Sequence, residues 1–394
     1  MISIDQALAI IDARVAPLAS EDVALNDAAG RYLAQSLHAR SDAPRHATSA
    51  MDGYAVDYAS VRAGDALRII GTAAAGAGGA LRLEPGQAAR IYTGAPLPDG
   101  ADGVIMQEYA HVSGDMVHFD AGFGPARHVR AAGSDFRAGD ILLAAGTRLC
   151  PRAMCVAAAA DVDVLAAAAA PRVAILATGD ELAAPGSAHR HPHLIPESVS
   201  FGVAAQAAAM GGQVVWRGAC ADDLARLTAA AGDALAAADL VVVTGGASVG
   251  DRDFAKSMFA AHGLETYWEK IAIKPGKPVW LGKASGRYVL GLPGNPTSAM
   301  VTGHLILRGL LARMQGASAA GLHRWMRLPL AAPIKATGNR ETFVRAAWQD
   351  DGLVPIAMQD SGAQAALNQA DWLIRCPAGQ AALPAGAMVS ALAF

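Results

Sequence analysis

The sequence has few cysteines and little net charge. Its cysteines are Cys150, Cys155, Cys220 and Cys376, and none of them form the C-x-x-C spacing found in many metal and redox sites. Such sparse and scattered cysteines predict reduced thiols and a cytoplasmic location, and they argue against a disulfide framework. The formal net charge is −3, and no basic face indicates a nucleic-acid partner.

Long apolar runs are also missing. The most apolar stretch, residues 153–170, is rich in alanine and is interrupted by Asp161 and Asp163, so we expect no membrane-spanning segment. The first eleven residues contain Asp5 and lack a basic start, which argues against a signal peptide. Aromatic residues make up only 5% of a chain that is 53% hydrophobic. Wholesale disorder is therefore excluded, and much of the core must consist of small side chains.

The length of 394 residues predicts two to four domains. Between residues 171 and 316, short apolar strands alternate with helical patterns. This alternation predicts a parallel sheet covered by helices on both faces.

Regions with a different texture flank this α/β region. Residues 41–135 and 317–394 contain short β-like segments separated by turns rich in glycine and proline, which predict compact β domains. Residues 4–16 and, less regularly, 22–37 have helical spacing. Residues 151–160 begin with a proline, which suits the first position of a helix.

Two buried strands of the predicted sheet end in glycine-containing turns, TGDE at 178–181 and TGGASVGDRD at 244–253. In open α/β sheets, ligands bind beyond the carboxyl ends of the strands. Glycines there let backbone N–H groups approach phosphate oxygens. One such loop is most simply an ordinary strand–helix turn, whereas two in the same domain favour a phosphate site.

Acidic residues lie in the same turns, at Asp180, Glu181, Asp251 and Asp253. Carboxylates beside a phosphate are unfavourable unless a cation intervenes, and Mg²⁺ does so by binding carboxylates together with substrate phosphates. Asp180 also suits the cap of a helix. We therefore assign functional roles to Glu181 and Asp253, and structural roles to Asp180 and Asp251.

The segment KIAIKPGKP at 270–278 contains three lysines in nine residues. Its prolines and glycine predict a rigid loop. A solvated run of charge is the ordinary alternative, but cations in fixed positions suit an oxyanion. The segment GLPGNPTS at 291–298 follows another predicted strand and begins a helix, whose N-terminus also attracts anions.

Six segments in this order resemble the molybdopterin molybdenumtransferase family, of the MoeA and gephyrin E-domain type. The resemblance runs nearly from end to end, and SAMDGYA is a specific motif. The segments are 49–56 (SAMDGYAV), 91–108, 178–182, 245–253, 273–278 and 291–298.

The resemblance implies a four-domain fold. A helical stalk would comprise residues 1–40 and 136–170 and would carry a small β domain at 41–135. A central α/β molybdopterin-binding domain with a parallel sheet, of the MogA type, would occupy 171–316. A β-barrel-like domain would occupy 317–394. The family forms an elongated homodimer, with its active site where the α/β domain of one subunit meets the N-terminal region of the other.

The resemblance also implies a set of site residues. The implied catalytic residues are Asp52, Thr93, Glu181 and Asp253, of which Asp52, Glu181 and Asp253 would hold Mg²⁺. Asp135 and Asp222 match further acidic positions. The implied substrate-binding residues are Gly245, Gly246, Ser248, Lys270, Lys274, Lys277, Pro293 and Pro296.

Two regions depart from the family pattern. Residues 197–199 read Glu-Ser-Val, where the family often has Asp-Ser-Asn. The C-terminal region keeps only a loose version of the pattern, at 340–345 and 361–363.

The activity implied is the insertion of molybdenum from molybdate into adenylylated molybdopterin, with Mg²⁺-dependent release of AMP. Molybdate and tungstate share shape and charge, so the sequence fits both. The adenylyltransferase and recipient molybdoenzymes would be further partners. One alternative is a molybdopterin adenylyltransferase that uses ATP, although the N-terminal β segments argue against it. The other is a non-catalytic carrier or scaffold, although the retained acidic and basic residues argue against that.

Overall fold

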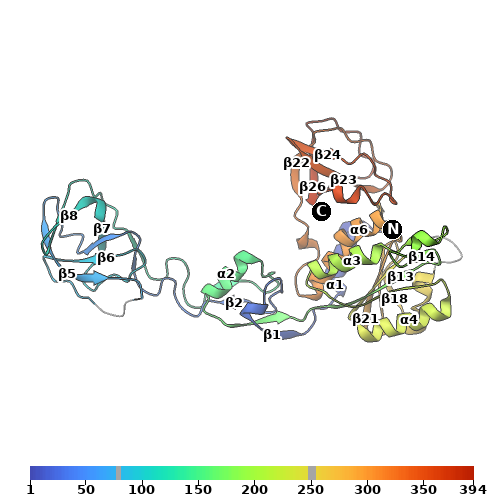
Figure 1. Ribbon diagram of the computed structural model, residues 1–394, viewed down its shortest axis with the longest axis horizontal. Helices are drawn as coiled ribbons and strands as arrows, with labels where there is room; N and C mark the ends of the chain where they lie inside the picture. Colours follow the sequence, from blue (N-terminus) through green and yellow to red (C-terminus); the bar gives the residue numbers. More distant parts are fainter. Residues whose placement is uncertain (77–80, 247–253) are drawn as a thin grey trace. The chain divides into compact units, whose positions relative to one another are not determined.

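The computed structural model describes residues 1–76, 81–246 and 254–394 (Figure 1). The chain divides into two compact units. The first unit comprises Met1–Gln35, Ala145–Cys150 and Val164–Phe394, and the second comprises Ser36–Ala144 and Pro151–Asp163. Within the described ranges, no helix is long and apolar enough to cross a membrane.

The centre of the first unit is a six-stranded sheet in the order β16-β13-β17-β21-β20-β18. The first four strands are parallel, and β20 runs antiparallel to both of its neighbours. The predicted α/β domain with a parallel sheet is confirmed. The strands are β13 (Arg172–Thr178), β16 (Gln213–Cys220), β17 (Leu240–Thr244), β18 (Glu265–Trp268), β20 (Trp280–Ala284) and β21 (Arg287–Leu292).

Helices cover both faces of this sheet (Figure 1). Along β13, Val173 and Ile175 face one helical layer, whereas Ala174 and Leu176 face the other. Both faces are therefore buried, which explains the continuous apolar sequence of the strand. One layer contains α1 (Ile4–Arg14), α3 (Val199–Ala209), α6 (Pro296–Thr302), a π-helical segment (Gly303–Leu307) and α7 (Arg308–Met314); the other contains α4 (Leu224–Ala237) and α5 (Phe254–Ser257).

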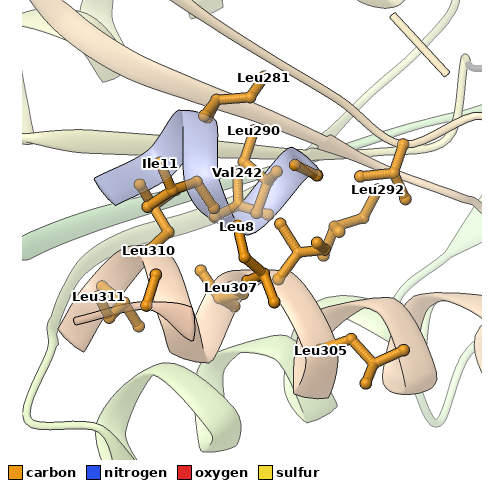
Figure 2. Packing of buried hydrophobic residues seen from close by; sticks show 14 of the residues in the cluster. Leu8, Ile11, Val242, Leu281, Leu290, Leu292, Leu305, Leu307, Leu310 and Leu311 are labelled. Carbon is orange, nitrogen blue, oxygen red and sulfur yellow. The ribbon is translucent and has the colours of Figure 1, made fainter. Parts of the chain in front are cut away.

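Helix α1 lies in the α/β core and not in a separate stalk. Figure 2 shows Leu8 and Ile11 of α1 between the sheet and the leucines of the π-helical segment and α7. The helix begins with a capping box in which the Ser3 hydroxyl accepts from the backbone N–H of Gln6 at 3.1 Å, and the Gln6 side chain accepts from the backbone N–H of Ser3 at 2.9 Å. Placing this helix in a stalk was wrong, because its apolar face is needed to close the core of a distant domain.

The predicted helix at 22–37 was also wrong. This segment contains the end of β1 (Ser20–Ala24), a 3-10 turn (Leu25–Asp27) and the start of β2 (Leu37–His38). Strand β1 pairs antiparallel with β12 (Val164–Ala168), and this long-range pairing overrides the weak helical spacing. The predicted proline-initiated helix is confirmed as α2 (Pro151–Ala159). Apart from the placement of α1, the four-domain boundaries stay a prediction.

The C-terminal part of the first unit is a second six-stranded sheet. Its order is β19-β23-β25-β26-β22. Strand β24 is outside this order and pairs antiparallel with the end of β23, at Ala346–Gln349. A bridge between Leu330 and Leu353 links the end of β22 to β24, so the sheet curls towards closure and the barrel-like prediction is confirmed. The strands are β19 (Ile273–Lys274), β22 (Met326–Pro329), β23 (Glu341–Gln349), β24 (Gly352–Pro355), β25 (Trp372–Cys376) and β26 (Met388–Ala393).

The second unit contains a third six-stranded sheet, in the order β7-β4-β6-β5-β9-β8, which confirms the predicted N-terminal β region. Tyr54 and Phe119 meet edge to face in its core, with ring centroids 6.2 Å apart. The strands are β4 (Gly53–Val56), β5 (Ala66–Ala73), β6 (Gln87–Ile91), β7 (Gly103–Met106), β8 (Ala110–Ser113) and β9 (Met116–Phe119). Two short antiparallel pairs complete this unit. Strand β2 pairs with β11 (Ile141–Leu143), and β3 (Thr48–Ser49) pairs with β10 (Val129–Arg130).

The packing of α1 predicts a large effect of Leu8→Ala. Leu8 is 3% exposed, and its truncation should lower the free energy of unfolding of the first unit by about 2–5 kcal/mol, because a cavity remains in the core. All six tryptophans lie in this unit, so tryptophan fluorescence during urea unfolding measures it selectively. Leu224→Ala, at a position 43% exposed on α4, is the matched control. Equal effects of the two substitutions would contradict the packing of α1.

Candidate functional site

A pocket of about 870 Å³ opens in the first unit at the carboxyl ends of β13, β17 and β21. Strand β13 ends at Thr178, β17 ends at Thr244, and the turns that follow both strands form part of the wall. Three parallel strands thus direct their loops to one edge of the sheet, where ligands bind in open α/β folds.

The turns after these strands pack in direct contact, and glycine makes this possible. Gly245 has φ +95°, and a Cβ added there would lie 2.5 Å from the carbonyl oxygen of Thr178. A Cβ on Gly294 would lie 3.2 Å from the Cα of Gly245. Any larger residue at Gly245 would force the turns apart, so the glycines set the shape of the pocket floor.

The structure brings most of the predicted α/β site residues together. Residues that line the pocket are Glu181, Asp222, Gly245, Gly246, Pro293 and Pro296. Ser248, Asp251 and Asp253 lie outside the described residues. Asp180 accepts the backbone N–H of Asp222 at 2.9 Å, which fits the structural role expected of it.

The wall is acidic. It contains Glu181, Glu197 and Asp222 and, within the described residues, no lysine, arginine or histidine. Glu197 is 7% exposed, and its carboxylate accepts the backbone N–H of Ser200 at 2.8 Å. The guanidinium of Arg217 lies 3.9 Å from the same carboxylate. Because the described wall has carboxylates and no cationic side chain, a phosphate there needs cations from elsewhere.

These contacts also explain the sequence Glu-Ser-Val at 197–199. The Glu197 carboxylate accepts the backbone N–H and the hydroxyl of Ser200 in the first turn of α3, and a carboxylate is favourable at a helix N-terminus. Val199 is 8% exposed and packs into the core cluster between α3 and the sheet. Glu197 and Val199, which stand where the family often has Asp and Asn, thus each have a structural partner at this edge of the pocket.

The lysine segment borders the pocket through Pro278. Its three lysines are exposed and are not among the described wall residues. Its backbone is fixed, because β19 pairs with β23 and a Cβ on Gly276, at φ +103°, would lie 2.0 Å from the Cγ2 atom of Thr302. The segment is not helical, as predicted, and its three lysines remain predicted ligands of an oxyanion.

The C-terminal sheet supplies two wall residues, Gly362 and Gln364, that the sequence did not predict. Their loop is bound to the start of α6. The backbone N–H of Thr297 donates to the carbonyl of Ser361 at 3.1 Å, and the side chain of Asn295 donates to the Ser361 hydroxyl at 3.2 Å. Gly362 lies in the loosely matched segment 361–363, but that match did not place it in the pocket, because the barrel reaches the pocket only after it docks on the α/β domain.

Arg345 of β23 holds this loop from behind. It is 1% exposed, and its Nη2 donates to the carbonyls of Met358 at 2.9 Å and Asp360 at 3.2 Å. Burial lowers the pKa of the Arg345 guanidinium, and the charge of Asp360 opposes that shift. A buried arginine that reaches several carbonyls fixes their positions together, so Arg345 sets the path of the loop into the pocket.

A second candidate site lies in the other unit, at the turn before β4. The Asp52 carboxylate accepts the backbone N–H of Thr93 at 2.7 Å and the Thr93 hydroxyl at 2.8 Å. The backbone bond, then the side-chain bond and the charge of Arg90 hold the pKa of the Asp52 carboxyl below its usual value. The structure therefore pairs two residues that lie 41 positions apart in the sequence.

Arg90 is a neighbour that the sequence did not predict. Its guanidinium lies 5.1 Å from the ring centroid of Tyr54 and 5.2 Å from that of Tyr92, and it donates to the Gln107 side chain. Asp135 is exposed in a turn of the same unit, and its backbone N–H donates to the carbonyl of Ala43.

The acidic side chains suit Mg²⁺ by their chemistry. No group of three or more His, Cys, Asp or Glu side chains within the described ranges could hold a metal by itself. Mg²⁺ does not need such a group, since it commonly binds one or two carboxylates together with phosphate oxygens and water. Glu181 and Asp222 in the pocket wall fit that pattern.

Three family models match consecutive parts of the chain. "MoeA N-terminal region (domain I and II)" matches residues 2–160, "Probable molybdopterin binding domain" matches 174–313, and "MoeA C-terminal region (domain IV)" matches 327–394. Two crystal structures of molybdopterin biosynthesis MoeA proteins from Pyrococcus horikoshii also match. One is 28% identical with a TM-score of 0.79, covering 100% of this chain and 99% of the other. The second is 23% identical with a TM-score of 0.84, covers 100% of both chains and supports the fold.

The fold and pocket thus place the chain among molybdopterin biosynthesis proteins. The molybdopterin molybdenumtransferase of Haemophilus influenzae is 33% identical over 318 residues, which cover 80% of this chain and 78% of that protein. The molybdopterin molybdenumtransferase of Synechococcus elongatus is 31% identical over 402 residues, which cover 99% of this chain and 98% of that protein. The chain belongs to the molybdopterin molybdenumtransferase family.

The two hydrogen bonds from Thr93 predict a titration shift. Thr93→Val removes the hydroxyl donor and keeps the backbone donor, so the pKa of Asp52 should rise part of the way towards its usual value of 3.8. Thr93→Ser should restore the wild-type value. The ¹³C shift of labelled aspartate carboxyls against pH measures this, with Asp52→Asn as the assignment control.

The sign of the stability effect follows from the lowered pKa. The ionised Asp52 carboxylate stabilises the folded state at pH values above the pKa of an unfolded aspartate. This stabilisation is lost as the pH falls through the lower pKa of Asp52 in the folded protein. Thr93→Val should therefore be less stable than wild type at neutral pH, and the difference should shrink in acid. An unchanged Asp52 titration in Thr93→Val would contradict the role of the hydroxyl.

Proposed function

We propose that this protein inserts molybdenum from molybdate into adenylylated molybdopterin and releases AMP. Membership of the molybdopterin molybdenumtransferase family supports this reaction. The observation that carries the proposal is the pocket at the carboxyl ends of β13, β17 and β21, which combines glycine turns with carboxylates. Glycine turns suit the phosphates of the substrate, and carboxylates suit the cation that the phosphates require.

Each part of the substrate has a counterpart among the chain's residues. Backbone N–H groups of the turn at Gly245, Gly246 and Ser248 would hold the phosphate on the pterin side, because no Cβ obstructs Gly245 or Gly246. Lys270, Lys274 and Lys277 would hold molybdate, a dianion. Pro293 and Pro296 would keep the adjoining loop in place at the start of α6.

Asp52, Glu181 and Asp253 would hold Mg²⁺, and Asp222 is a further acidic candidate. When bound, Mg²⁺ neutralises charge on the phosphoanhydride oxygens. The lowered pKa of Asp52 keeps that carboxylate ionised at neutral pH, ready to bind a cation. Thr93 orients it through two hydrogen bonds. Water would attack the phosphoanhydride, so that AMP leaves and the phosphate of molybdopterin stays behind. Molybdate would lose one oxo group as water, with the two dithiolene thiol protons, as molybdenum binds the two sulfurs.

The proposal predicts a large loss of activity in Glu181→Gln. This change removes a carboxylate charge from the pocket and keeps the shape of the side chain. Molybdate-dependent release of AMP should fall by about 100-fold or more, equivalent to about 2.7 kcal/mol in the activation barrier. The measurement is AMP release by the purified protein with Mg²⁺, with and without molybdate. Glu265→Gln is the matched control, since that side chain is 64% exposed on β18.

The same assay separates the alternatives. A wild-type protein that binds adenylylated molybdopterin tightly and releases no AMP in either condition would be a carrier. AMP-adduct formation that depends on ATP would instead identify an adenylyltransferase. Full activity in Glu181→Gln would disprove the assigned role of that carboxylate.

We also propose that the protein acts as a homodimer in which Asp52 and Thr93 of one subunit serve the active site of the other. Co-expression of Asp52→Ala and Glu181→Gln chains with different tags tests this arrangement. Heterodimers would then contain one intact site, and random pairing should restore about a quarter of wild-type activity. Each variant expressed alone should stay inactive. No recovery in purified heterodimers would show that both residues act within one chain.

A further inference from the structure

The first unit has a second pocket of about 800 Å³, and it shares no wall residue with the first. Its wall combines α3, the π-helical segment and α7 with the C-terminal β region. Arg148 and Arg308 both line it. The proposed reaction does not use these two guanidiniums.

Neutral acceptors hold Arg148 in place. Its Nε donates to the carbonyl of Gly30 at 3.3 Å, and its Nη2 donates to the carbonyl of Ala209 at 2.7 Å. These contacts fix the guanidinium plane and leave its full positive charge uncompensated. The side chain is thus oriented before any ligand arrives.

Neutral partners hold Arg308 as well. Its Nε lies 3.5 Å from the sulfur of Met210, and its Nη1 lies 2.9 Å from Nε2 of His304. Burial, followed by the charge of Arg308, lowers the pKa of His304 to about 3. The imidazole is therefore uncharged at neutral pH and can accept the N–H of Arg308.

No ion pair with a carboxylate forms at either arginine within the part of the chain that the structure describes, although Asp371 is part of the same wall. Burial lowers the pKa of Arg308, and the charge of Arg148 lowers it further. Both charges also act on the hydroxyl of Tyr32, a residue that is 2% exposed and whose hydroxyl has no hydrogen-bond partner among the described residues. An anion would relieve this repulsion between like charges.

The rest of the wall includes apolar surface. Met210 is 1% exposed, and Met300 and Phe394 also line the pocket. The volume exceeds that of a lone oxyanion and lies within the range of small-molecule sites. Methionine adapts to flat or irregular apolar groups. A ligand that matches this wall has an anionic head and an apolar body.

We propose that this second pocket binds a small organic oxyanion whose phosphate or carboxylate head is held by Arg148 and Arg308 and whose apolar body packs on Met300 and Phe394. The planar guanidinium fork is suited to both head groups. This site is separate from the proposed reaction and does not depend on it.

Calorimetric titration of the full chain with phenyl phosphate and with benzoate, at constant ionic strength, tests the site. Wild-type protein should bind at least one probe saturably, and the tighter probe identifies the head group. Arg148→Gln and Arg308→Gln should each weaken binding by about 10-fold or more, the usual effect of losing a charge-assisted hydrogen bond. Glu181→Gln, in the first pocket, should leave this binding unchanged. Neither arginine should affect AMP release.

Circular dichroism of each variant without ligand shows whether it is folded. Arg148 is exposed, so Arg148→Gln keeps the test valid if Arg308→Gln fails to fold. Binding that requires the arginines and tolerates Glu181→Gln supports the site. Absence of saturable binding of both probes to wild-type protein, or equal binding by the folded arginine variants, overturns it.

Discussion

The candidate active site depends on the close contact of three backbone turns. The turns after β13, β17 and β21 touch because Gly245 and Gly294 have no side chains to separate them. This contact brings Thr178, Glu181 and the start of α6 to one pocket wall. The same absence of side chains leaves backbone N–H groups accessible to a phosphate, so one packing requirement serves both the fold and the chemistry.

Charge imposes the second requirement. An acidic wall cannot accept a phosphorylated substrate without cations, and the chain has two ways to supply them. A divalent ion can use the acids directly. The lysine segment can add fixed positive charge at the border, because β19 and Gly276 anchor its backbone to the C-terminal sheet and to α6. The C-terminal sheet therefore shapes the pocket from two directions, through the lysine segment and through the loop that Arg345 holds.

Sequence reasoning succeeded where the determining forces are local or periodic. The buried runs of β13 and β17, the glycine turns that follow them and the proline-initiated α2 all have short-range signatures. It failed where distant contacts decide the outcome. Residues 22–24 end a strand and not a helix, because β12 pairs with β1. Gly362 and Gln364 reach the pocket through docking. The charge of Arg90, on another strand, acts on the Asp52 carboxyl. The motif resemblance selected Asp52 and Thr93, but only the structure shows that they hydrogen-bond.

The position of α1 has a consequence for the order of folding. Leu8 and Ile11 share one buried cluster with Leu290, Leu292 and Leu310 (Figure 2), so α1 is synthesised nearly 300 residues before its most distant partners. Such distant contacts carry a large loop-closure entropy and slow folding. The α/β core therefore closes only after synthesis is almost complete, and until then the nascent chain exposes an apolar helix that a chaperone could bind.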